Sequence, residues 1–426
     1  MKFQAVKGTR DFYPEQMALR NWLTEAWRRV SLRNGFVEID GPVLEYLDLF
    51  RVKSGQEIVS QLFSFTDRGG RELAMRPEIT PTLARMVNAR INSLPRPIKW
   101  FCIPRLWRAE KPQRGRLREF FQWNVDIVGS DEVTADAECI FTAVDFLREV
   151  GLEPKDVQVR IGSRALTTAA LRRVGVGDSQ MEAALAALDK RPRVKPEAFA
   201  EMATAAGVPA DRLDEIRRFQ DAPDLPAAAE ALANEPQTAE EIQRLEDLVA
   251  MLKNMGAADY CRLDMRMVRG LAYYTGIVYE VWDAQEALRA VAGGGRYDNL
   301  LEVLGGPEIG ATGFGMGDAV LSILLEEKGK LPDVSARLDC FVIDADKGLF
   351  QRVLEAVGRL RQGGLAADYS FKRQALGKQL KEANRRGARY AIIMGTDAVG
   401  VKNLATGEQT DVPAGEFLTE PEKYLK

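Results

Sequence analysis

The chain has 426 residues, of which 28% are charged, with 59 basic side chains against 62 acidic ones. This length predicts two or three domains, and the composition is that of a globular protein rather than a disordered or collagen-like one. No apolar stretch is long enough to cross a membrane, and the first residues lack the apolar core of a signal peptide, so no membrane association is expected. Four widely separated cysteines show neither metal-ligand spacing nor a disulfide framework, which favours a reducing cytoplasm.

The chain contains no histidine. This excludes Ser-His-Asp and Cys-His catalysis, imidazole acid–base chemistry and histidine-ligated zinc. Any reaction must therefore rely on arginine, lysine, carboxylate, tyrosine, glutamine and backbone groups, or on a borrowed metal ion. The net charge of −3 gives no overall sign of nucleic-acid binding, but it leaves room for a local basic face.

The first part of the chain mixes helical and strand patterns. Apolar residues recur with helical spacing over 15–35. The run at 35–50 alternates like a strand that Gly41-Pro42 interrupts, and residues 59–76 have the pattern of a hairpin. These segments therefore predict one helix followed by strands.

Two more strands are predicted on either side of a basic loop. They cover residues 98–108 and 118–129, and the charged loop 109–117 joins them. A helix is expected before them, after Pro77. Because the strands follow each other closely, they should form a hairpin that carries the loop at its tip.

The composition changes after about residue 164. From there the chain is rich in Ala, Glu, Leu and Arg, with helical periodicity and almost no strand signal. This pattern predicts an inserted helical module at about 165–257. Strand character returns at 259–283.

The last hundred residues predict a separate domain that begins after a break near Leu331-Pro332. Strands and helices alternate there, which predicts a small α/β domain with a mainly parallel sheet. The predicted elements are strands at 338–344, 366–369 and 389–395, helices at 347–362 and 375–387, and a closing strand or hairpin at 400–412.

The segment RLWRAEKPQRGRLREFFQ, residues 105–122, carries the strongest chemical signal because arginines outnumber acids in it. A hairpin can hold guanidinium groups against phosphate oxygens, since arginine offers a fixed bidentate geometry. Phe120 and Phe121 alternate in direction, so only one ring can share a cleft with Arg108 and offer itself to a flat base. A solvated basic hairpin with a core aromatic residue is the alternative.

Three glycine-containing segments follow. In RMVRGLAYYTGIVYEVW, Arg269 and Tyr274 could lie together over a polar cleft, although Tyr273 and Tyr279 could be ordinary strand residues. The glycines of AGGGRYDNL would let the backbone approach a ligand closely, but a plain turn would explain them as well. GFGMGDAV lacks the ending and the spacing of a phosphate-binding loop, so a P-loop or dinucleotide site is rejected.

Taken in order, these segments resemble the histidyl-tRNA synthetases, a family of class II aminoacyl-tRNA synthetases, over essentially the whole chain. RPEITP resembles the family's histidine-binding turn, and VRGLAYYTG and GGGRYD resemble its two signature segments. The other segments that carry the resemblance are KGTRDFYPEQM at the start, GFVEIDGPVLEYLDLF with Pro42 (class II motif 1), WRAEKPQRGRLREFFQ (motif 2) and LGKQLKEANRRGARYAIIMG (the anticodon-binding domain).

The resemblance implies an α+β catalytic domain at 1–330, built on the class II antiparallel sheet flanked by helices, with the helical insertion inside it. It implies an α/β anticodon-binding domain at 331–426. The implied activity is that of a histidine–tRNA ligase, which activates L-histidine with ATP and transfers it to the 3′ end of tRNA(His). Such an enzyme is a cytoplasmic homodimer, with motif 1 in its interface. Mg²⁺ enters with the ATP, and no protein side chain is assigned as a metal ligand.

The resemblance also implies roles for single residues. Arg108 resembles the motif 2 arginine that holds the α-phosphate and the substrate carboxylate, and Arg269 the arginine that stabilises charge at the α-phosphate. Glu110 falls at the adenine-recognition position, and Phe120 on the ring that stacks on adenine. The ATP-binding set is thus Arg108, Glu110 and Phe120. The histidine-binding positions are Glu78, Thr80, Arg108, Gln122, Asp126 (where many members have Glu), Arg269, Tyr274 and Tyr297. Gln113 and Arg114 face the tRNA acceptor end.

A chain without histidine can perform this chemistry. The substrate carboxylate is already ionised, so its attack on the α-phosphorus of ATP requires no proton removal. Catalysis then consists of alignment and of stabilising charge on the phosphorus and the departing pyrophosphate, which two arginines and Mg²⁺ can supply. A tyrosine hydroxyl and a carboxylate can recognise the two imidazole nitrogens.

Three positions depart from the family pattern. Val320 stands where class II motif 3 ordinarily ends in an arginine that contacts the γ-phosphate and covers adenine. Ala272 replaces an aspartate and Phe121 a histidine. Because a missing guanidinium leaves the triphosphate less well held, either another cation replaces it, with Arg118 and Arg296 as candidates, or the protein is a weakened paralogue.

Two other function classes share part of this pattern. A catalytically weakened regulatory paralogue would keep the fold, but such subunits typically lack the anticodon domain and lose the arginine found here at Arg269. A tRNA-binding protein would have no reason to keep Glu78, Arg108 and Arg269 together. The sequence therefore favours the synthetase.

Overall fold

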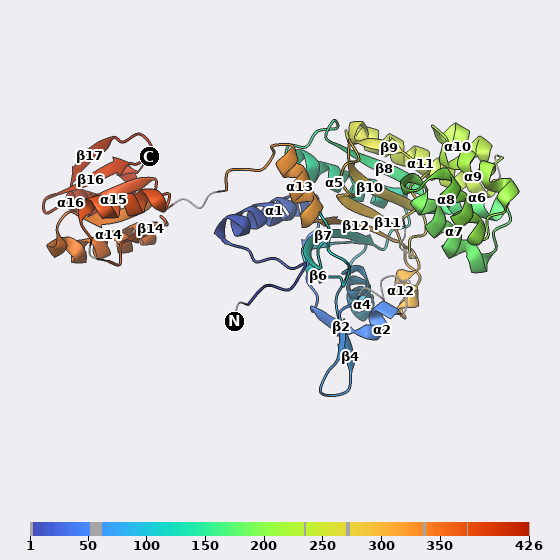
Figure 1. The fold of residues 1–426 in the computed structure, drawn as a ribbon, viewed down its shortest axis with the longest axis horizontal. Helices are drawn as coiled ribbons and strands as arrows, with labels where there is room; N and C mark the ends of the chain where they lie inside the picture. The colour runs from blue at the N-terminus through green and yellow to red at the C-terminus, as the bar shows by residue number, and fades with distance from the viewer. Residues whose placement is uncertain are drawn as a thin grey trace. The chain divides into compact units, whose positions relative to one another are not determined.

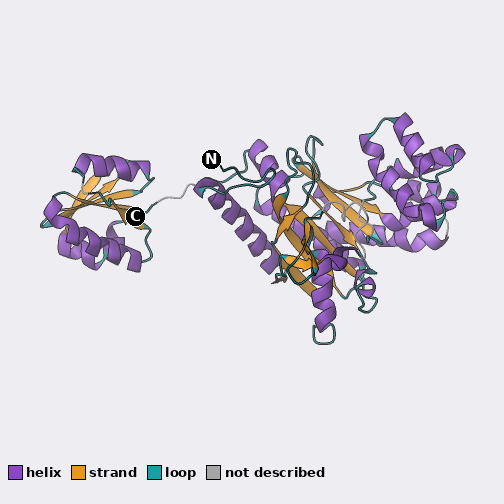
Figure 2. Ribbon diagram, turned by 60° about the horizontal axis from the view of Figure 1, so that its bottom comes forward, coloured by secondary structure: helices purple, strands orange, loops and turns teal. Residues whose placement is uncertain are grey.

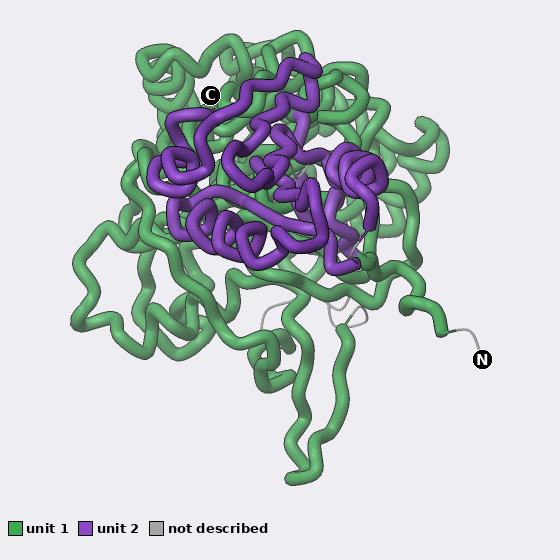
Figure 3. The backbone as a smooth tube through the Cα atoms, turned by 90° about the vertical axis from the view of Figure 1, so that its left-hand side faces the viewer, with its two compact units in different colours: residues 1–11, 20–332 green, residues 12–19, 333–426 purple. Residues whose placement is uncertain are grey.

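The structure is a computed structural model that describes residues 3–51, 62–233, 236–269, 273–334, 338–372 and 374–425. The chain divides into two compact units (Figure 3). The first unit consists of residues 1–11 and 20–332, and the second of residues 12–19 and 333–426. Within the described ranges, no helix is both long and apolar enough to cross a membrane.

A nine-stranded sheet forms the centre of the first unit (Figures 1 and 2). Its order is β1-β5-β7-β12-β11-β10-β8-β9, with β6 paired to β7. The interior pairs are antiparallel as predicted, but the edge strands β1 and β9 run parallel to their neighbours, so the sheet is mixed. The strands are β1 (Val37–Glu38), β5 (Ile98–Cys102), β6 (Arg105–Trp107), β7 (Glu119–Val128), β8 (Val157–Ser163), β9 (Cys261–Leu263), β10 (Ile277–Asp283), β11 (Ala292–Arg296) and β12 (Ala311–Gly317).

Helices α1 (Pro14–Arg33) and α5 (Val133–Glu149) pack on this sheet through aromatic rings. Trp27 of α1 stacks on Trp123 of β7 with 6.2 Å between ring centroids, and Phe146 of α5 contacts both rings. All three side chains are fully buried. Because aromatic rings bury large areas and add a geometric preference, this cluster fixes the helices against β7, the strand that carries the end of motif 2.

The segment between β1 and β5 forms a small three-stranded sheet and helices. The strand order is β2-β4-β3, and the described part of the predicted hairpin is confirmed as β3 and β4, whereas residues 59–61 lie outside the described ranges. The strand prediction for the end of the 35–50 run is wrong, because Leu47 and Phe50 are both buried at helical spacing. The elements of this segment are β2 (Leu44–Tyr46), α2 (Leu47–Arg51), β3 (Ser64–Thr66), β4 (Glu72–Met75) and α4 (Thr80–Arg90). Two further helices of the first unit come later in the chain: α12 (Leu300–Val303) follows β11, and α13 (Asp318–Glu327) follows β12.

The strand predicted at 98–108 is two strands, β5 and β6. Pro104 lies between them and has no N–H to donate to a sheet ladder, so the pairing stops there. Similarly, the helix predicted after Pro77 begins only at Thr80, with Pro81 in its first turn. Proline is tolerated there because first-turn N–H groups lack helical partners.

The predicted helical segment after residue 164 is helical in its described residues. It shares the hydrophobic core of the sheet, because Leu245 and Leu248 of its last long helix belong to the same buried cluster as Ile140 of α5. The elements are α6 (Arg164–Arg173), α7 (Asp178–Lys190), η1 (Arg191–Arg193), α8 (Pro196–Ala205), η2 (Ala210–Arg212), α9 (Leu213–Gln220), α10 (Leu225–Ala231), α11 (Pro236–Asn254) and η3 (Ala258–Tyr260).

The second unit contains a five-stranded sheet of order β14-β13-β15-β16-β17. Cys340 and Val342 of β13 face one buried cluster, whereas Phe341 and Ile343 face the other, so helices cover both sides. The closing hairpin makes the last two pairings antiparallel, and the sheet is mixed rather than mainly parallel as predicted. The elements are β13 (Cys340–Asp344), η4 (Lys347–Leu349), α14 (Phe350–Gln362), β14 (Ala367–Tyr369), α15 (Leu376–Arg385), β15 (Tyr390–Met394), β16 (Ala398–Asn403), β17 (Gln409–Pro413), α16 (Ala414–Thr419) and η5 (Pro421–Tyr424).

A buried ion pair joins β11 to α5. Arg296 Nη2 lies 2.6 Å from Asp136 Oδ2, and both side chains are almost completely buried. We expect Arg296→Met to lower the free energy of unfolding by about 3–5 kcal/mol, because Asp136 would keep a buried charge without its partner. Urea denaturation followed by tryptophan fluorescence measures this, since all six tryptophans belong to the first unit.

The matched control is Arg51→Met, which breaks the exposed pair of Arg51 with Glu72. Exposed pairs contribute little, so this variant should lose less than about 1 kcal/mol. Equal effects of the two substitutions would contradict a structural role for the buried pair.

Candidate active site

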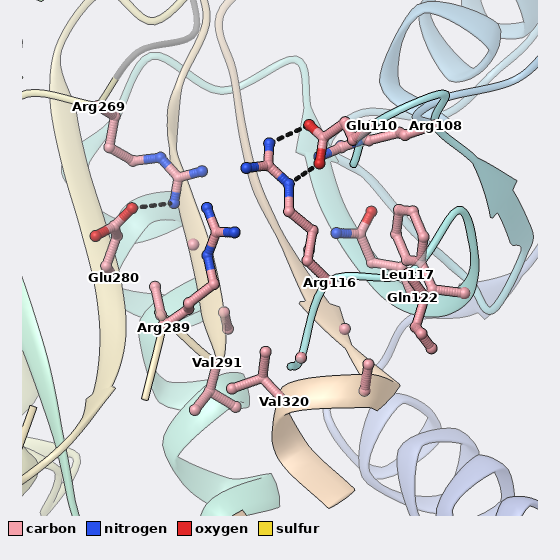
Figure 4. Close-up of a pocket in the computed structure, with 18 residues that line it drawn as sticks. Arg108, Glu110, Arg116, Leu117, Gln122, Arg269, Glu280, Arg289, Val291 and Val320 are labelled. Carbon is pink, nitrogen blue, oxygen red and sulfur yellow. Dashed lines mark hydrogen bonds and ion pairs between the residues drawn. The ribbon is translucent and has the colours of Figure 1, made fainter. Parts of the chain in front are cut away.

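Two adjoining cavities lie over strands β7, β11 and β12. The tyrosine cavity is bounded by Tyr273, Tyr274 and Tyr297, and the arginine cavity by Arg116 and Arg289 (Figure 4). Residues that line both are Arg108, Gln122, Arg269, Gly293 and Gly315. The two cavities therefore meet at two guanidinium groups.

The structure brings the predicted site residues together in these cavities. The eight predicted histidine-binding positions all line the tyrosine cavity, and the predicted ATP-binding positions Arg108, Glu110 and Phe120 all line the arginine cavity. The tyrosine cavity has a volume of about 160 Å³. Pockets for drug-sized ligands are typically about 300–1,000 Å³, so this one suits a single small metabolite.

Glycines in β11 and β12 make room for the functional side chains. A Cβ built at Gly293 would lie 1.3 Å from Arg269 Nη1, and one at Gly313 would lie 2.3 Å from Asp126 Oδ1. The glycine cluster is thus a strand in which the protein's own side chains approach the backbone closely, and the plain turn that was the alternative is wrong. GFGMG likewise lies in a strand, β12.

Two tyrosines hold two buried carboxylates in the tyrosine cavity. Tyr297 donates a hydrogen bond to Asp126 Oδ1 at 2.5 Å, and Tyr273 donates to Glu78 Oε2 at 2.9 Å. The other oxygen of Asp126, Oδ2, is buried without a hydrogen-bond partner in the described part of the chain. A buried acceptor without a partner is unusual, so this oxygen is available to a donor on a ligand.

Burial raises the pKa of Asp126 to about 7. The hydrogen bond from Tyr297 acts to lower this pKa, and the charge of Glu78 acts to raise it further. At neutral pH the carboxyl group is therefore poised between its two protonation states, which is common in functional sites.

Arg269 adopts a strained backbone conformation. Its φ is 59°, in the left-handed region that residues other than glycine rarely adopt and that costs about 1–3 kcal/mol. Its Nη1 lies 3.3 Å from Glu280 Oε1, and its Cζ lies 5.4 Å from the ring centre of Tyr274. Burial acts to lower the pKa of Arg269, but Tyr274 and Glu280 outweigh it and the net shift is upward. The guanidinium therefore stays charged at the junction of the cavities.

The predicted alternation of the two phenylalanines is confirmed. Phe120 lines the arginine cavity, with the Cζ of Arg108 5.3 Å from its ring centre. Phe121 is buried on the other side, where the Cζ atoms of Arg20 and Arg105 lie 3.8 and 4.8 Å from its ring centre. A flat ring and a guanidinium thus share one cleft.

The predicted tRNA-facing residues lie outside both cavities. Gln113 and Arg114 are exposed in the loop between β6 and β7, where Gly115 turns the chain with φ of 72°. Arg114 forms an ion pair with Glu327 of α13. The loop therefore presents these polar side chains at the surface.

Neither arginine proposed as a substitute at position 320 reaches the site. Arg296 is committed to Asp136, and Arg118 donates to the backbone oxygen of Glu110 at 3.0 Å and does not line either cavity. Both hypotheses are wrong because these side chains already serve to hold the fold. Ala272 lies outside the described residues.

Four charged or phenolic residues at the site were not assigned from the sequence: Tyr273, Glu280, Arg116 and Arg289. Tyr273 and Tyr274 precede β10, so strand alternation does not separate them and both reach the cavity. Glu280 could have been found as the lone acid in the apolar run IVYEVW. The described residues contain no cluster of three or more carboxylate or cysteine side chains that could hold a metal ion.

Comparison with known proteins identifies the family. Residues 8–318 match the family model for histidyl-tRNA synthetase, and residues 339–423 match that for the anticodon binding domain. The chain belongs to the histidyl-tRNA synthetase family. Its fold is therefore a class II catalytic domain followed by an anticodon-binding domain.

Relatives match over nearly the full chain. The histidine–tRNA ligase of Opitutus terrae is 40% identical over 96% of both chains. The chloroplastic/mitochondrial histidine–tRNA ligase of Arabidopsis thaliana is 38% identical over 96% of this chain and 85% of its own. The crystal structure of histidyl-tRNA synthetase from Nostoc sp. PCC 7120 covers 100% of both chains with a TM-score of 0.83 and 23% identity, so it has the same fold.

The raised pKa of Asp126 predicts a pH-dependent stability. Below about pH 4 both the native and the unfolded chain hold the proton, whereas above it only the native state retains it. The free energy of unfolding therefore falls as the pH rises to about 7, where the loss reaches about 4 kcal/mol because folding shifts the pKa from 3.8 to about 7. Asp126→Asn should remove this part of the pH dependence.

Urea denaturation of the wild type and of Asp126→Asn at about pH 4 and pH 8 measures the difference between their pH dependences. Glu302→Gln, at an exposed position on α12, is the control and should keep the wild-type pH dependence. Parallel stability curves for the wild type and Asp126→Asn would show that Asp126 is not protonated in the native state.

Proposed function

We propose that this chain is a histidine–tRNA ligase, which joins L-histidine to ATP to form histidyl-adenylate and then transfers the histidyl group to the 3′ end of tRNA(His). The observation that carries this proposal is the buried Oδ2 of Asp126, which has no partner among the described residues and lies in a cavity that meets Arg108 and Arg269. An imidazole N–H is a donor that fits this acceptor. The relatives named above support the same activity.

Histidine fits the tyrosine cavity in one orientation. Its imidazole N–H donates to Asp126 at one end of the cavity, while its ammonium group is attracted by Glu78, whose carboxylate Tyr273 orients. Its carboxylate then reaches Arg108 and Arg269, where the two cavities meet. Hydrogen bonds to a buried carboxylate give strong selection, because an amino acid without the donor leaves Asp126 unpaired.

ATP fits the arginine cavity with its adenine on Phe120 and its α-phosphate beside Arg108 and Arg269. A carboxylate oxygen of histidine forms a bond to the α-phosphorus, and the bond from that phosphorus to the bridging oxygen breaks. Pyrophosphate leaves with the electron pair, and no proton moves. The Mg²⁺ that accompanies ATP neutralises part of the phosphate charge, and the two arginines stabilise the charge that develops at the α-phosphorus.

We assign tRNA binding to two surfaces. The loop at 109–117 faces the acceptor end through Gln113 and Arg114, and residues 331–426 form the domain that binds the anticodon, with residues 1–330 as the catalytic domain. The match of residues 339–423 to an anticodon binding domain supports this assignment. A regulatory paralogue is not favoured, since it would not require a strained, charged Arg269 beside the cavity.

The proposal includes a homodimer in the cytoplasm. Val37, Leu44, Tyr46 and Phe65 are large apolar side chains that are exposed on β1, β2 and β3, and three of them belong to the segment that resembles motif 1 or lie beside it. Tyr46 and Phe65 both pair with Leu73 of β4, so they lie on one face of the small sheet, and exposed apolar residues gathered in this way are typical of an interface. The four cysteines are free thiols, which suits a reducing compartment.

Arg269→Ala should slow histidine-dependent exchange of pyrophosphate into ATP by more than about 100-fold, which corresponds to about 3 kcal/mol of transition-state stabilisation. Exchange assays on the folded variant measure this. Arg266→Ala is the control, because Arg266 pairs with Asp264 and lines neither cavity. Exchange within a few-fold of wild type in Arg269→Ala would remove this residue from the mechanism.

Arg114→Ala should separate the two steps of the reaction. Arg114 lies outside both cavities, so exchange should keep its wild-type rate. Loss of one charged contact to tRNA should lower kcat/KM for tRNA in the charging assay about tenfold, and the remaining affinity should depend less steeply on salt. Equal losses in exchange and in charging would contradict the assignment of this loop to tRNA.

A further inference from the structure

The arginine cavity holds four arginines, and three of them already have partners. Arg116 forms an ion pair with Glu110, and Arg269 forms one with Glu280. Arg108 donates from Nε to the backbone oxygen of Pro77 at 3.1 Å. Arg289 is the fourth.

The charged side chains that affect the pKa of Arg289 are those of Arg193 and Arg108. No carboxylate in the described part of the chain is close enough to pair with it or to favour its charged form. Burial lowers the pKa of its guanidinium, and the nearby charges of Arg193 and Arg108 lower it further. The Arg289 side chain is exposed by its surface area but lines the arginine cavity, where two like charges make its own charge unfavourable; a polyanion would relieve this repulsion.

The backbone holds Arg289 in place. It lies in the connection between β10 and β11, where the carboxylate of Asp283 accepts hydrogen bonds from the backbone N–H groups of Gln285 and Leu288 at 2.9 and 2.8 Å. Glu286 in the same connection forms an ion pair with Arg160 of β8. The loop is therefore fixed from both sides, so that little ordering is needed when a ligand binds.

The guanidinium of Arg289 lies near those of Arg269 and Arg116 in the arginine cavity. Figure 4 shows its guanidinium reaching from beside Val291 toward the space between Arg269 and Arg116, above Val320. The end of the cavity near Val320 is small and apolar, because Ala290, Val291 and Ala319 also line it. Terminal phosphates that extend from an α-phosphate beside Arg108 and Arg269 toward Val320 would pass the guanidinium of Arg289.

We propose that Arg289 binds the β- and γ-phosphates of ATP and supplies, from the β10–β11 connection, the positive charge that the side chain at position 320 does not provide. This inference rests on the proposed function, because it assumes that the arginine cavity holds ATP. Guanidinium groups suit this task, since they bind phosphate oxygens in a bidentate geometry.

The test compares a nucleotide that has the terminal phosphates with one that lacks them. Binding of ATP and of AMP to the full-length chain is measured by calorimetry in the presence of Mg²⁺, for the wild type and for Arg289→Met. We expect Arg289→Met to weaken ATP binding at least about tenfold and to leave AMP binding within about twofold. In the exchange assay KM for ATP should rise, whereas KM for histidine should not change.

The matched control is Arg193→Met, which removes a neighbouring arginine that lines neither cavity. It should change both affinities by less than about twofold, because a charge that does not touch the ligand is screened by salt. Unchanged ATP affinity in Arg289→Met, or equal losses for ATP and AMP, would overturn the inference.

The proposed function is tested separately by histidine-dependent exchange in the wild type. If the wild type exchanges pyrophosphate but Arg289→Met binds ATP normally, the assignment of Arg289 alone fails. If the wild type shows no exchange with histidine, the proposed function fails, and the inference fails with it.

Discussion

The site depends on glycines in two strands, because the absence of their side chains leaves room for the functional side chains of other residues. In β11 and β12, glycines face each other across the ladder, with Gly293 opposite Gly315 and Gly295 opposite Gly313. Arg269 occupies the space that a side chain at Gly293 would need. A guanidinium can therefore lie against the backbone of a buried strand and still line a cavity, although strands with glycine pack less well than those with larger residues. The aromatic cluster beneath β7 offsets that loss by fixing the sheet from its other face.

Some charged residues in this region stabilise the fold, and others line the cavities. Arg296 and Asp136 neutralise each other below the sheet, and this pair serves to hold α5. Asp126 is buried with one oxygen unpaired among the described residues, and Arg269 is partly buried with a strained backbone. Both features cost folding free energy and leave groups that a ligand can bind. The buried ion pair therefore stabilises the fold, whereas the buried carboxylate oxygen without a hydrogen-bond partner faces a cavity.

The sequence predicted most of the charged and aromatic residues that line the two cavities, because its motifs resemble segments of one family. It did not predict contacts between residues that are far apart in the sequence. Successive side chains of a strand point to opposite faces, so the sequence alone predicts that Phe120 or Phe121, but not both, shares a cleft with Arg108. The role of Arg296 could not be predicted, because its partner Asp136 lies 160 positions away in the sequence and only the folded sheet brings the two together. Strand boundaries failed for a related reason: the burial of Phe50 at helical spacing is a tertiary effect that outweighs local alternation.

A chain without histidine has a consequence for any complex with the amino acid it is proposed to bind. The imidazole of bound histidine would be the sole imidazole in the binary complex, because the protein contributes none. Its ring protons and nitrogens would give magnetic resonance signals free of overlap from other imidazoles in a protein of 47.4 kDa. The tautomer and the charge of the ring would then report directly which partner, Asp126 or the imidazole, holds the shared proton.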